Sequence, residues 1–184
     1  MIENPTPKAI TIWLTGLSGS GKTTLANALG EKLKEKNINY LCIDGDVLRD
    51  GLCNDLGFTD ADRKENMRRA SCLAKMMNDQ GQIAIVSLIS PFKAERETAK
   101  DLIGQSNFIE IFIDCSWEEC AQRDRKGLYK KVENGTLLQF TGKDSKYEAP
   151  ENPAVHIKSS QIDVSASLAM IISEIDRRFP LILA

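Results

Sequence analysis

The sequence lacks several features that would place the protein in a membrane or on nucleic acid. Its 184 residues contain no apolar run near the about 20 residues that a membrane-spanning helix needs. Residues 1–8 lack the basic start and apolar core of a secretory signal. The net charge is −2, which does not favour nucleic acid or an anionic membrane as a partner. With no repeat or low-complexity tract, we expect a single domain over residues 1–184.

Cysteine and histidine do not occur in the patterns that bind metals. The five cysteines include no C-x-x-C pair and are odd in number, which favours reduced thiols in a cytoplasmic protein. The spacing of Cys115, Cys120 and the single histidine, His156, does not support a zinc site. We therefore interpret His156 as a surface or lid residue.

The sequence does contain a phosphate-binding loop. Residues 16–23 read GLSGSGKT and fit the pattern G-x-x-x-x-G-K-[ST]. A β-branched run precedes the loop and helical apolar spacing follows it, which disfavours the alternative of a simple glycine-rich turn. Glycines let backbone N–H groups converge on an anion, Lys22 can reach the β- and γ-phosphates, and Thr23 can bind Mg²⁺. The loop predicts a nucleoside triphosphate.

Strand-like and helical segments alternate along the rest of the chain. We expect strands at residues 10–15, 38–43, 83–89, 108–113 and 162–164. Helices are expected from near Lys22 to residue 33, at 64–80, at 91–103, after Ser116 as the N-cap, and at 165–179. This order predicts an α/β fold, the three-layer P-loop kinase type, with a central, mostly parallel five-stranded sheet and helices on both faces. The polar, aperiodic residues 126–153 predict a mobile lid.

Ligands of such sheets bind beyond the carboxyl ends of the strands. Asp44 and Asp46 flank a glycine after the second strand, where one carboxylate can hold Mg²⁺ and the other can accept a proton from a hydroxyl. A simple turn is the alternative for this triplet taken alone. Ser90 precedes Pro91 at a helix start, so it is either an N-cap, which the spacing favours, or a hydroxyl near the transferred phosphate.

Cations and an aromatic side chain follow in the next polar stretch. Arg49 and Arg63 suit phosphate or sulfate oxygens. Arg68 and Arg69 could join them, although a solvated basic helix face is the simpler interpretation of that pair. Phe58 lies in a polar loop, where an aromatic ring can stack on a base.

Six stretches together resemble the adenylyl-sulfate (APS) kinases: GLSGSGKTT, DGDVLRDGL, LGFTDADRKENMRR, SLISPFKAER, RDRKGLYKK and FTGKDSKYEAPENP. They occur in the family's order between Ile10 and His156. The resemblance implies transfer of the γ-phosphate of ATP to the 3′-hydroxyl of APS, with Mg²⁺, to form ADP and 3′-phospho-APS (PAPS) in sulfate assimilation. It also implies a homodimer.

The resemblance further implies roles for residues at matching positions. The catalytic residues would be Lys22, Asp44, Asp46 and Ser90. ATP would contact Gly16, Leu17, Ser18, Gly19, Ser20, Gly21, Lys22, Thr23, Thr24 and Arg123, with Thr23 and Asp44 near Mg²⁺. APS would contact Asp46, Arg49, Phe58, Arg63, Asn66, Ile89, Ser90, Lys130, Phe140 and Thr141. Phe58 and Phe140 would sandwich its adenine, and Ser90 matches a phospho-enzyme serine that direct in-line transfer does not need.

Four positions depart from residues that are frequent in that family: Val47, Glu133, Thr136 and Lys143. None of them lies in the phosphate loop or among the paired aspartates and phenylalanines. Two alternatives remain: a 3′-kinase for another nucleotide conjugate, and a P-loop protein that binds nucleotide without catalysis.

Overall fold

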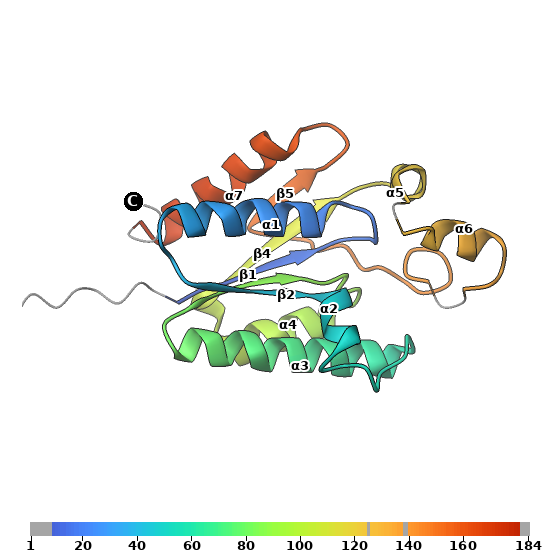
Figure 1. Ribbon diagram of the computed structural model, residues 1–184, viewed down its shortest axis with the longest axis horizontal. Coiled ribbons are helices and arrows are strands. Elements are labelled where there is room, and N and C mark those ends of the chain that lie inside the picture. Colours follow the sequence, from blue (N-terminus) through green and yellow to red (C-terminus); the bar gives the residue numbers. More distant parts are fainter. Residues whose placement is uncertain (1–8, 125, 138–139, 181–184) are drawn as a thin grey trace, which may run out of the picture.

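A parallel sheet forms the middle layer of the molecule (Figure 1). The computed structural model describes residues 9–124, 126–137 and 140–180. The strand order is β2-β3-β1-β4-β5, and each neighbouring pair is parallel. The strands are β1 (Thr11–Thr15), β2 (Tyr40–Asp44), β3 (Ile83–Ser87), β4 (Phe108–Asp114) and β5 (Val155–Lys158). The predicted five-stranded sheet is therefore confirmed.

Helices cover both faces of this sheet (Figure 1). One face carries α1 (Lys22–Glu35) and α7 (Val164–Arg178), and the other carries α3 (Asp60–Asp79) and α4 (Lys93–Ile103). The short helices are α2 (Gly45–Asp50), α5 (Trp117–Arg123), α6 (Leu128–Glu133) and the 3-10 turn η1 (Gln105–Asn107). The three-layer prediction is confirmed.

The alternating faces of the buried strands build two cores. Ile12 and Leu14 of β1 pack with α1 and α7, whereas Trp13 packs with α3 and α4. All five residues of β1 are buried, as expected for the middle of a parallel sheet.

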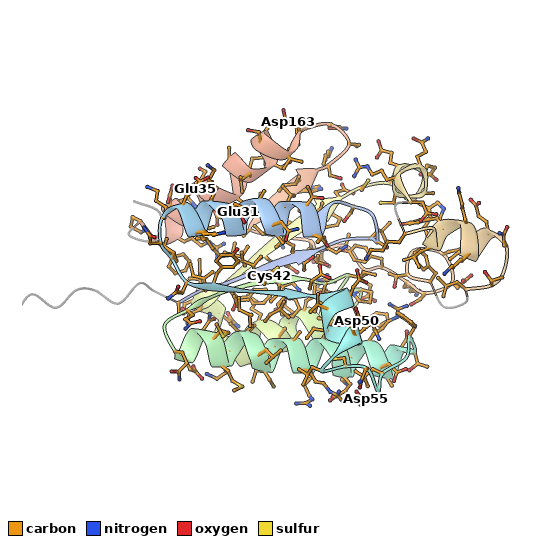
Figure 2. All side chains as sticks on the ribbon, in the orientation of Figure 1. Glu31, Glu35, Cys42, Asp50, Asp55 and Asp163 are labelled. Atoms are coloured by element: carbon orange, nitrogen blue, oxygen red, sulfur yellow. The ribbon has the colours of Figure 1, made fainter. Side chains whose placement is uncertain are left out.

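The outer faces of the helices carry charged side chains. Glu31 and Glu35 lie on the solvent side of α1, and Asp163 lies at the start of α7 (Figure 2). No helix of the described part is long and apolar enough to cross a membrane.

The expected last strand at residues 162–164 is wrong. The fifth strand is Val155–Lys158, an edge strand in which only Val155 and Ile157 are buried. Its inward residues are too few to stand out from the surrounding polar sequence. Asp163 instead caps α7, because its carboxylate accepts the N–H of Ala166 at 2.7 Å.

Two predicted helix starts also move. The helix expected from Lys64 begins at Asp60, because Thr59 and Asp62 form a capping box. The helix expected from Pro91 begins at Lys93. Residues 44–63 and 126–153 also contain helices α2 and α6, which their polar composition did not reveal.

A buried amide ties α3 to the start of β1. Asn78 accepts the Thr11 hydroxyl at 2.8 Å and donates to the carbonyls of Ile10 at 3.0 Å and Gln82 at 2.9 Å. Replacing it would leave the buried Thr11 hydroxyl without a partner, whereas the Ile10 carbonyl would keep the Ala84 N–H at 3.0 Å.

We predict that Asn78→Ala lowers the free energy of unfolding by about 2 kcal/mol, because it leaves the buried Thr11 hydroxyl without a partner and removes one of the two donors to the Ile10 carbonyl. Urea denaturation measures the change. The matched control, Asn54→Ala, removes an exposed amide and should change it by less than about 0.5 kcal/mol. Equal effects of the two substitutions would contradict this role.

Candidate active site

The loop between β1 and α1 has a shape that only glycine allows at its first position. Gly16 has φ 151°, and a Cβ there would lie 2.4 Å from the Ile113 carbonyl oxygen. Gly21 has φ 108°, and a Cβ there would meet nothing within 4 Å, so its surroundings are open. The N–H of Leu25 donates to Gly21 O, which leaves the preceding N–H groups of α1 available to an anion.

Lys22 folds back over this loop. Its Nζ donates to the carbonyls of Gly16 at 2.9 Å and Leu17 at 2.7 Å. Burial lowers its pKa to about 8, while Cys120 and Asp44 act in the opposite direction. An anion in the loop can replace the two carbonyls as partner of the ammonium group.

Asp44 connects the loop to α2. Its Oδ2 accepts the Thr23 hydroxyl at 2.8 Å, and its Oδ1 accepts the Asp46 N–H at 2.9 Å. The second bond makes Asp44 the N-cap of α2, so the aspartate triplet both begins a helix and faces the phosphate loop. Thr23 and Asp44 offer hydroxyl and carboxylate oxygens, the donors that Mg²⁺ prefers.

Asp46 forms an ion pair with Lys126 of the predicted lid. Both side chains are more than half exposed. Lys126 does not stand out in the sequence as a site residue, because it is one of several cations in RDRKGLYKK. Lys130, a predicted site residue, donates its backbone N–H to Asp124 at 3.1 Å, and its side chain is exposed.

Arg49, Arg63 and Phe58 come together beside α2. Arg49 donates to the Gly57 carbonyl at 2.7 Å, and its guanidinium lies 4.3 Å from the centre of the Phe58 ring. Arg63 donates to the Phe58 carbonyl at 3.0 Å. Burial lowers the pKa of both arginines, and the charge of Arg49 lowers that of Arg63 further. Two close cations beside a half-exposed ring suit an aromatic ligand that carries negative charge.

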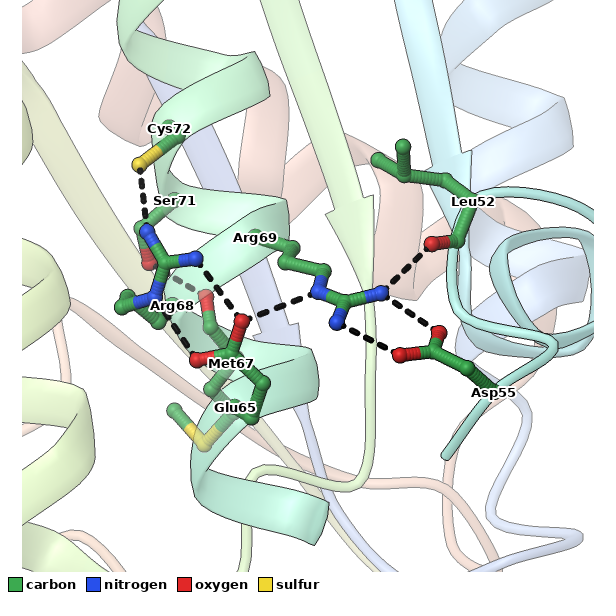
Figure 3. A network of polar contacts seen from close by, with 8 residues as sticks. All are labelled: Leu52, Asp55, Glu65, Met67, Arg68, Arg69, Ser71 and Cys72. Carbon is green, nitrogen blue, oxygen red and sulfur yellow. Dashed lines mark hydrogen bonds and ion pairs between the residues drawn. The ribbon is translucent and has the colours of Figure 1, made fainter. Parts of the chain in front are cut away.

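Arg69 contacts the neighbouring loop, whereas Arg68 contacts only residues of its own helix (Figure 3). Arg69 donates to both carboxylate oxygens of Asp55 at 2.6 and 2.8 Å and to the carbonyl of Leu52 at 2.8 Å. Arg68 and Arg69 both pair with Glu65 on their own helix. These contacts support the interpretation of a basic helix face outside the site, and those of Arg69 hold residues 52–55 against α3.

The N-cap interpretation of Ser90 is wrong. The N-cap of α4 is Phe92, and Ser90 lies before it with φ 49°. Its hydroxyl is buried and accepts the indole N–H of Trp13 at 2.9 Å. The adjacent Ile89 carbonyl accepts the Thr15 hydroxyl at 2.7 Å, so both residues are fixed at the end of β1.

The lid has an aromatic cluster of its own. Phe140 is buried and packs edge-on against Trp117 and Tyr129, at ring-centre distances of 5.7 and 5.0 Å. Tyr129 donates its hydroxyl to the Ser18 carbonyl at 2.7 Å, which attaches this cluster to the phosphate loop. In the described residues Phe58 and Phe140 make no ring contact with each other.

Three predicted site residues keep an unpartnered polar atom in the interior. They are Ser20 (Oγ), Asn66 (Oδ1) and Thr141 (Oγ1). Over the described ranges the only other such atom is Oε2 of Glu95. Buried polar atoms almost always have a partner, so an exception needs an explanation. A ligand on the phosphate loop and a second one beneath the lid would supply the missing partners.

Three features lie beside this arrangement. Arg123 donates to the carbonyls of Gly19 and Ser20 and, at 2.8 Å, to that of Ser159. A pocket of about 480 Å³ opens between the end of β4 and residues 142–149. Its lining includes Leu17 but neither Asp46 nor the Arg49–Phe58 group, so it is separate from the acceptor side. His156 pairs with Asp114 at 2.8 Å on the edge strand.

Comparison with known proteins agrees with this geometry. The family model for adenylylsulphate kinase matches residues 8–158. The chain belongs to the adenylylsulphate kinase family. It is 48% identical to the adenylyl-sulfate kinase of Aeromonas hydrophila over 89% of this chain and 83% of the relative. It is 50% identical to that of Citrobacter koseri over 84% of this chain and 77% of the relative.

A solved structure is similar over most of its length. The Mycobacterium tuberculosis APS kinase CysC, determined with AMPPNP and APS, superposes with a TM-score of 0.88 at 40% identity. The match covers 92% of this chain and 99% of that one.

We predict that Gly16→Ala weakens ATP binding at least about tenfold, because its Cβ would collide with the Ile113 carbonyl and displace the loop. Titration with a fluorescent ATP analogue measures the affinity. In the control Gly51→Ala, φ is −128° and the nearest atom, Val47 O, is 3.7 Å away, so affinity should not change. Unchanged binding by Gly16→Ala would contradict the proposed loop geometry.

Proposed function

We propose that this protein transfers the γ-phosphate of ATP to the 3′-hydroxyl of APS and releases ADP and PAPS. The main support for this proposal is that two candidate anion-binding sites lie at the same edge of the sheet. The phosphate loop at Lys22 forms one, and Arg49 with Arg63 forms the other. The carboxylate of Asp46 belongs to the same edge. Membership of the adenylylsulphate kinase family agrees with this chemistry.

The donor half consists of residues 16–24 and Arg123. Backbone N–H groups and Lys22 bind the phosphates and stabilise the charge that develops on the transferred group. Thr23 and Asp44 would hold Mg²⁺, which when bound neutralises phosphate charge. The unpartnered hydroxyl of Ser20 is available to the same ligand.

The acceptor half supplies the proton acceptor. The 3′-oxygen of APS forms a bond to the γ-phosphorus while the bond from that phosphorus to the β–γ bridging oxygen breaks. Asp46 takes the hydroxyl proton, and Lys126 keeps the carboxylate oriented before the substrate arrives. We propose direct transfer with no phosphorylated Ser90, because in-line attack by the 3′-oxygen needs no phosphorylated enzyme intermediate. The Ser90 hydroxyl is buried and accepts the Trp13 indole N–H.

The remaining predicted contacts are assigned to APS. Arg49 and Arg63 would bind the phosphosulfate, and Phe58 would stack on the adenine. Phe140 would complete the sandwich after the lid, residues 126–153, closes over the site. The residues that would complete the pocket are Asn66, Ile89, Ser90, Lys130 and Thr141.

Three further features belong to the proposal. The chain would act as one domain of residues 1–184, as a homodimer, and in the cytoplasm. The cytoplasmic location is supported by five free cysteines, three of them buried. Light scattering coupled to size-exclusion chromatography tests the dimer.

An assay of ADP formation separates APS from other acceptors. With Mg²⁺ and ATP, APS should turn over far faster than a nucleoside monophosphate. Equal rates would favour a kinase for another nucleotide conjugate. If none of the acceptors stimulated ADP formation, the result would favour a protein that binds nucleotide without catalysis.

We predict that Asp46→Asn lowers kcat by about 100-fold or more while the KM for ATP stays within about twofold, because it removes a proton acceptor and no ATP contact. Steady-state kinetics with both substrates varied measure the two effects. Equal losses of rate and ATP affinity would argue against this role.

We predict that Lys126→Met lowers kcat/KM for APS about tenfold, because Asp46 loses its cationic partner. The control Lys131→Met removes an exposed lysine of the same segment and should leave kcat/KM unchanged. If both variants behave alike, the Asp46–Lys126 pair has no part in turnover.

A further inference from the structure

Arg96 is a buried arginine on α4 whose guanidinium joins three elements. Its Nε donates to Glu110 of β4 at 2.9 Å, and its Nη1 donates to the Ser90 carbonyl at 2.8 Å. Its Nη2 donates to the carbonyl of Glu148, in the lid segment, at 2.7 Å. The side chain is only 3% exposed, and a charge so buried is costly unless it is paired and hydrogen-bonded.

Neighbouring contacts fix the same part of the lid. The Glu148 N–H donates to the Pro91 carbonyl at 2.8 Å, and the Glu148 carboxylate accepts the Lys93 N–H at 2.8 Å. The Tyr147 hydroxyl lies 2.9 Å from the Thr15 hydroxyl, at the end of β1. Residues 147–148 are thus attached both to the segment after β3 and to the strand that leads into the phosphate loop.

Ser90 needs support from its surroundings. A residue other than glycine at φ 49° is in a sparsely populated conformation, which persists only where neighbouring contacts enforce it. The Arg96 bond holds its carbonyl, and the Trp13 indole holds its hydroxyl. Arg96 therefore connects a strained residue at the acceptor side to the fixed end of the lid.

We propose that Arg96 is a positioning residue that sets the place of the lid relative to the acceptor pocket. The lid then pivots at residues 147–148, and its moving part consists of the described residues 126–137 and 140–146 rather than the whole of 126–153. Thr141, with its unpartnered buried hydroxyl, lies within that moving part. This inference rests on the proposed function, because its kinetic effect is expected on APS and not on ATP.

The decisive variant is Arg96→Lys. It keeps the charge beside Glu110. However, a single ammonium group lacks the forked geometry of the guanidinium and cannot donate to all three acceptors. We expect the KM for APS to rise about tenfold and the KM for ATP to change by less than about twofold. In limited proteolysis, APS should protect residues 126–146 in the parent protein but not in the variant.

Lys93→Met is the matched control. It breaks the exposed Lys93–Glu151 ion pair, which also joins α4 to this segment, and should leave both KM values and the protection unchanged. If Arg96→Lys does not fold, Tyr147→Phe decides, because it removes only the bond to Thr15 and should raise the KM for APS about threefold.

Two results would overturn the proposal. One is an equal rise of the KM for APS and for ATP, and the other is a lower melting temperature with unchanged kinetics and protection. Failure of the proposed function has a different signature, since the parent protein itself would then form no ADP in response to APS.

Discussion

The parallel pairing of β1 with both β3 and β4 is the constraint on which the site depends. Leu14 pairs with Ser87 on one side, and Thr15 pairs with Phe112 on the other. Asp44 of β2 is in register with the same Ser87. Because the carboxyl ends of these strands meet at one edge, the Thr23 hydroxyl can reach Asp44, although 21 positions separate them.

The site is built to be completed by ligands. Lys22 uses carbonyls of its own loop, and the Asp46 carboxylate has a lid lysine as its partner. Ser20, Asn66 and Thr141 keep buried atoms without partners. Buried polar atoms with a purely structural role normally have hydrogen-bond partners within the protein. Substrate binding can therefore exchange partners that are already oriented, which limits the reorganisation that phosphoryl transfer requires.

Local patterns in the sequence predicted the sheet, the phosphate loop and the paired aspartates, because each depends on neighbouring residues. The edge strand β5 was missed, since only Val155 and Ile157 point inward. The role of Ser90 could not be read from its neighbours, because its partner Trp13 is 77 positions away. Nothing in the sequence distinguishes Lys126 from the lysines near it. Only the fold brings it to Asp46, which lies 80 positions earlier in the chain.

A crystal structure with ADP, Mg²⁺ and APS bound would show whether the two halves of the site act together. We expect the ADP phosphates within hydrogen-bond distance of Ser20 and of the Lys22 ammonium, and the 3′-hydroxyl of APS against Asp46. We also expect Asn66 and Thr141 to gain partners from APS or from water bound to it. If APS instead bound away from Asp46 and those buried atoms stayed unpartnered, the proposed site would be wrong.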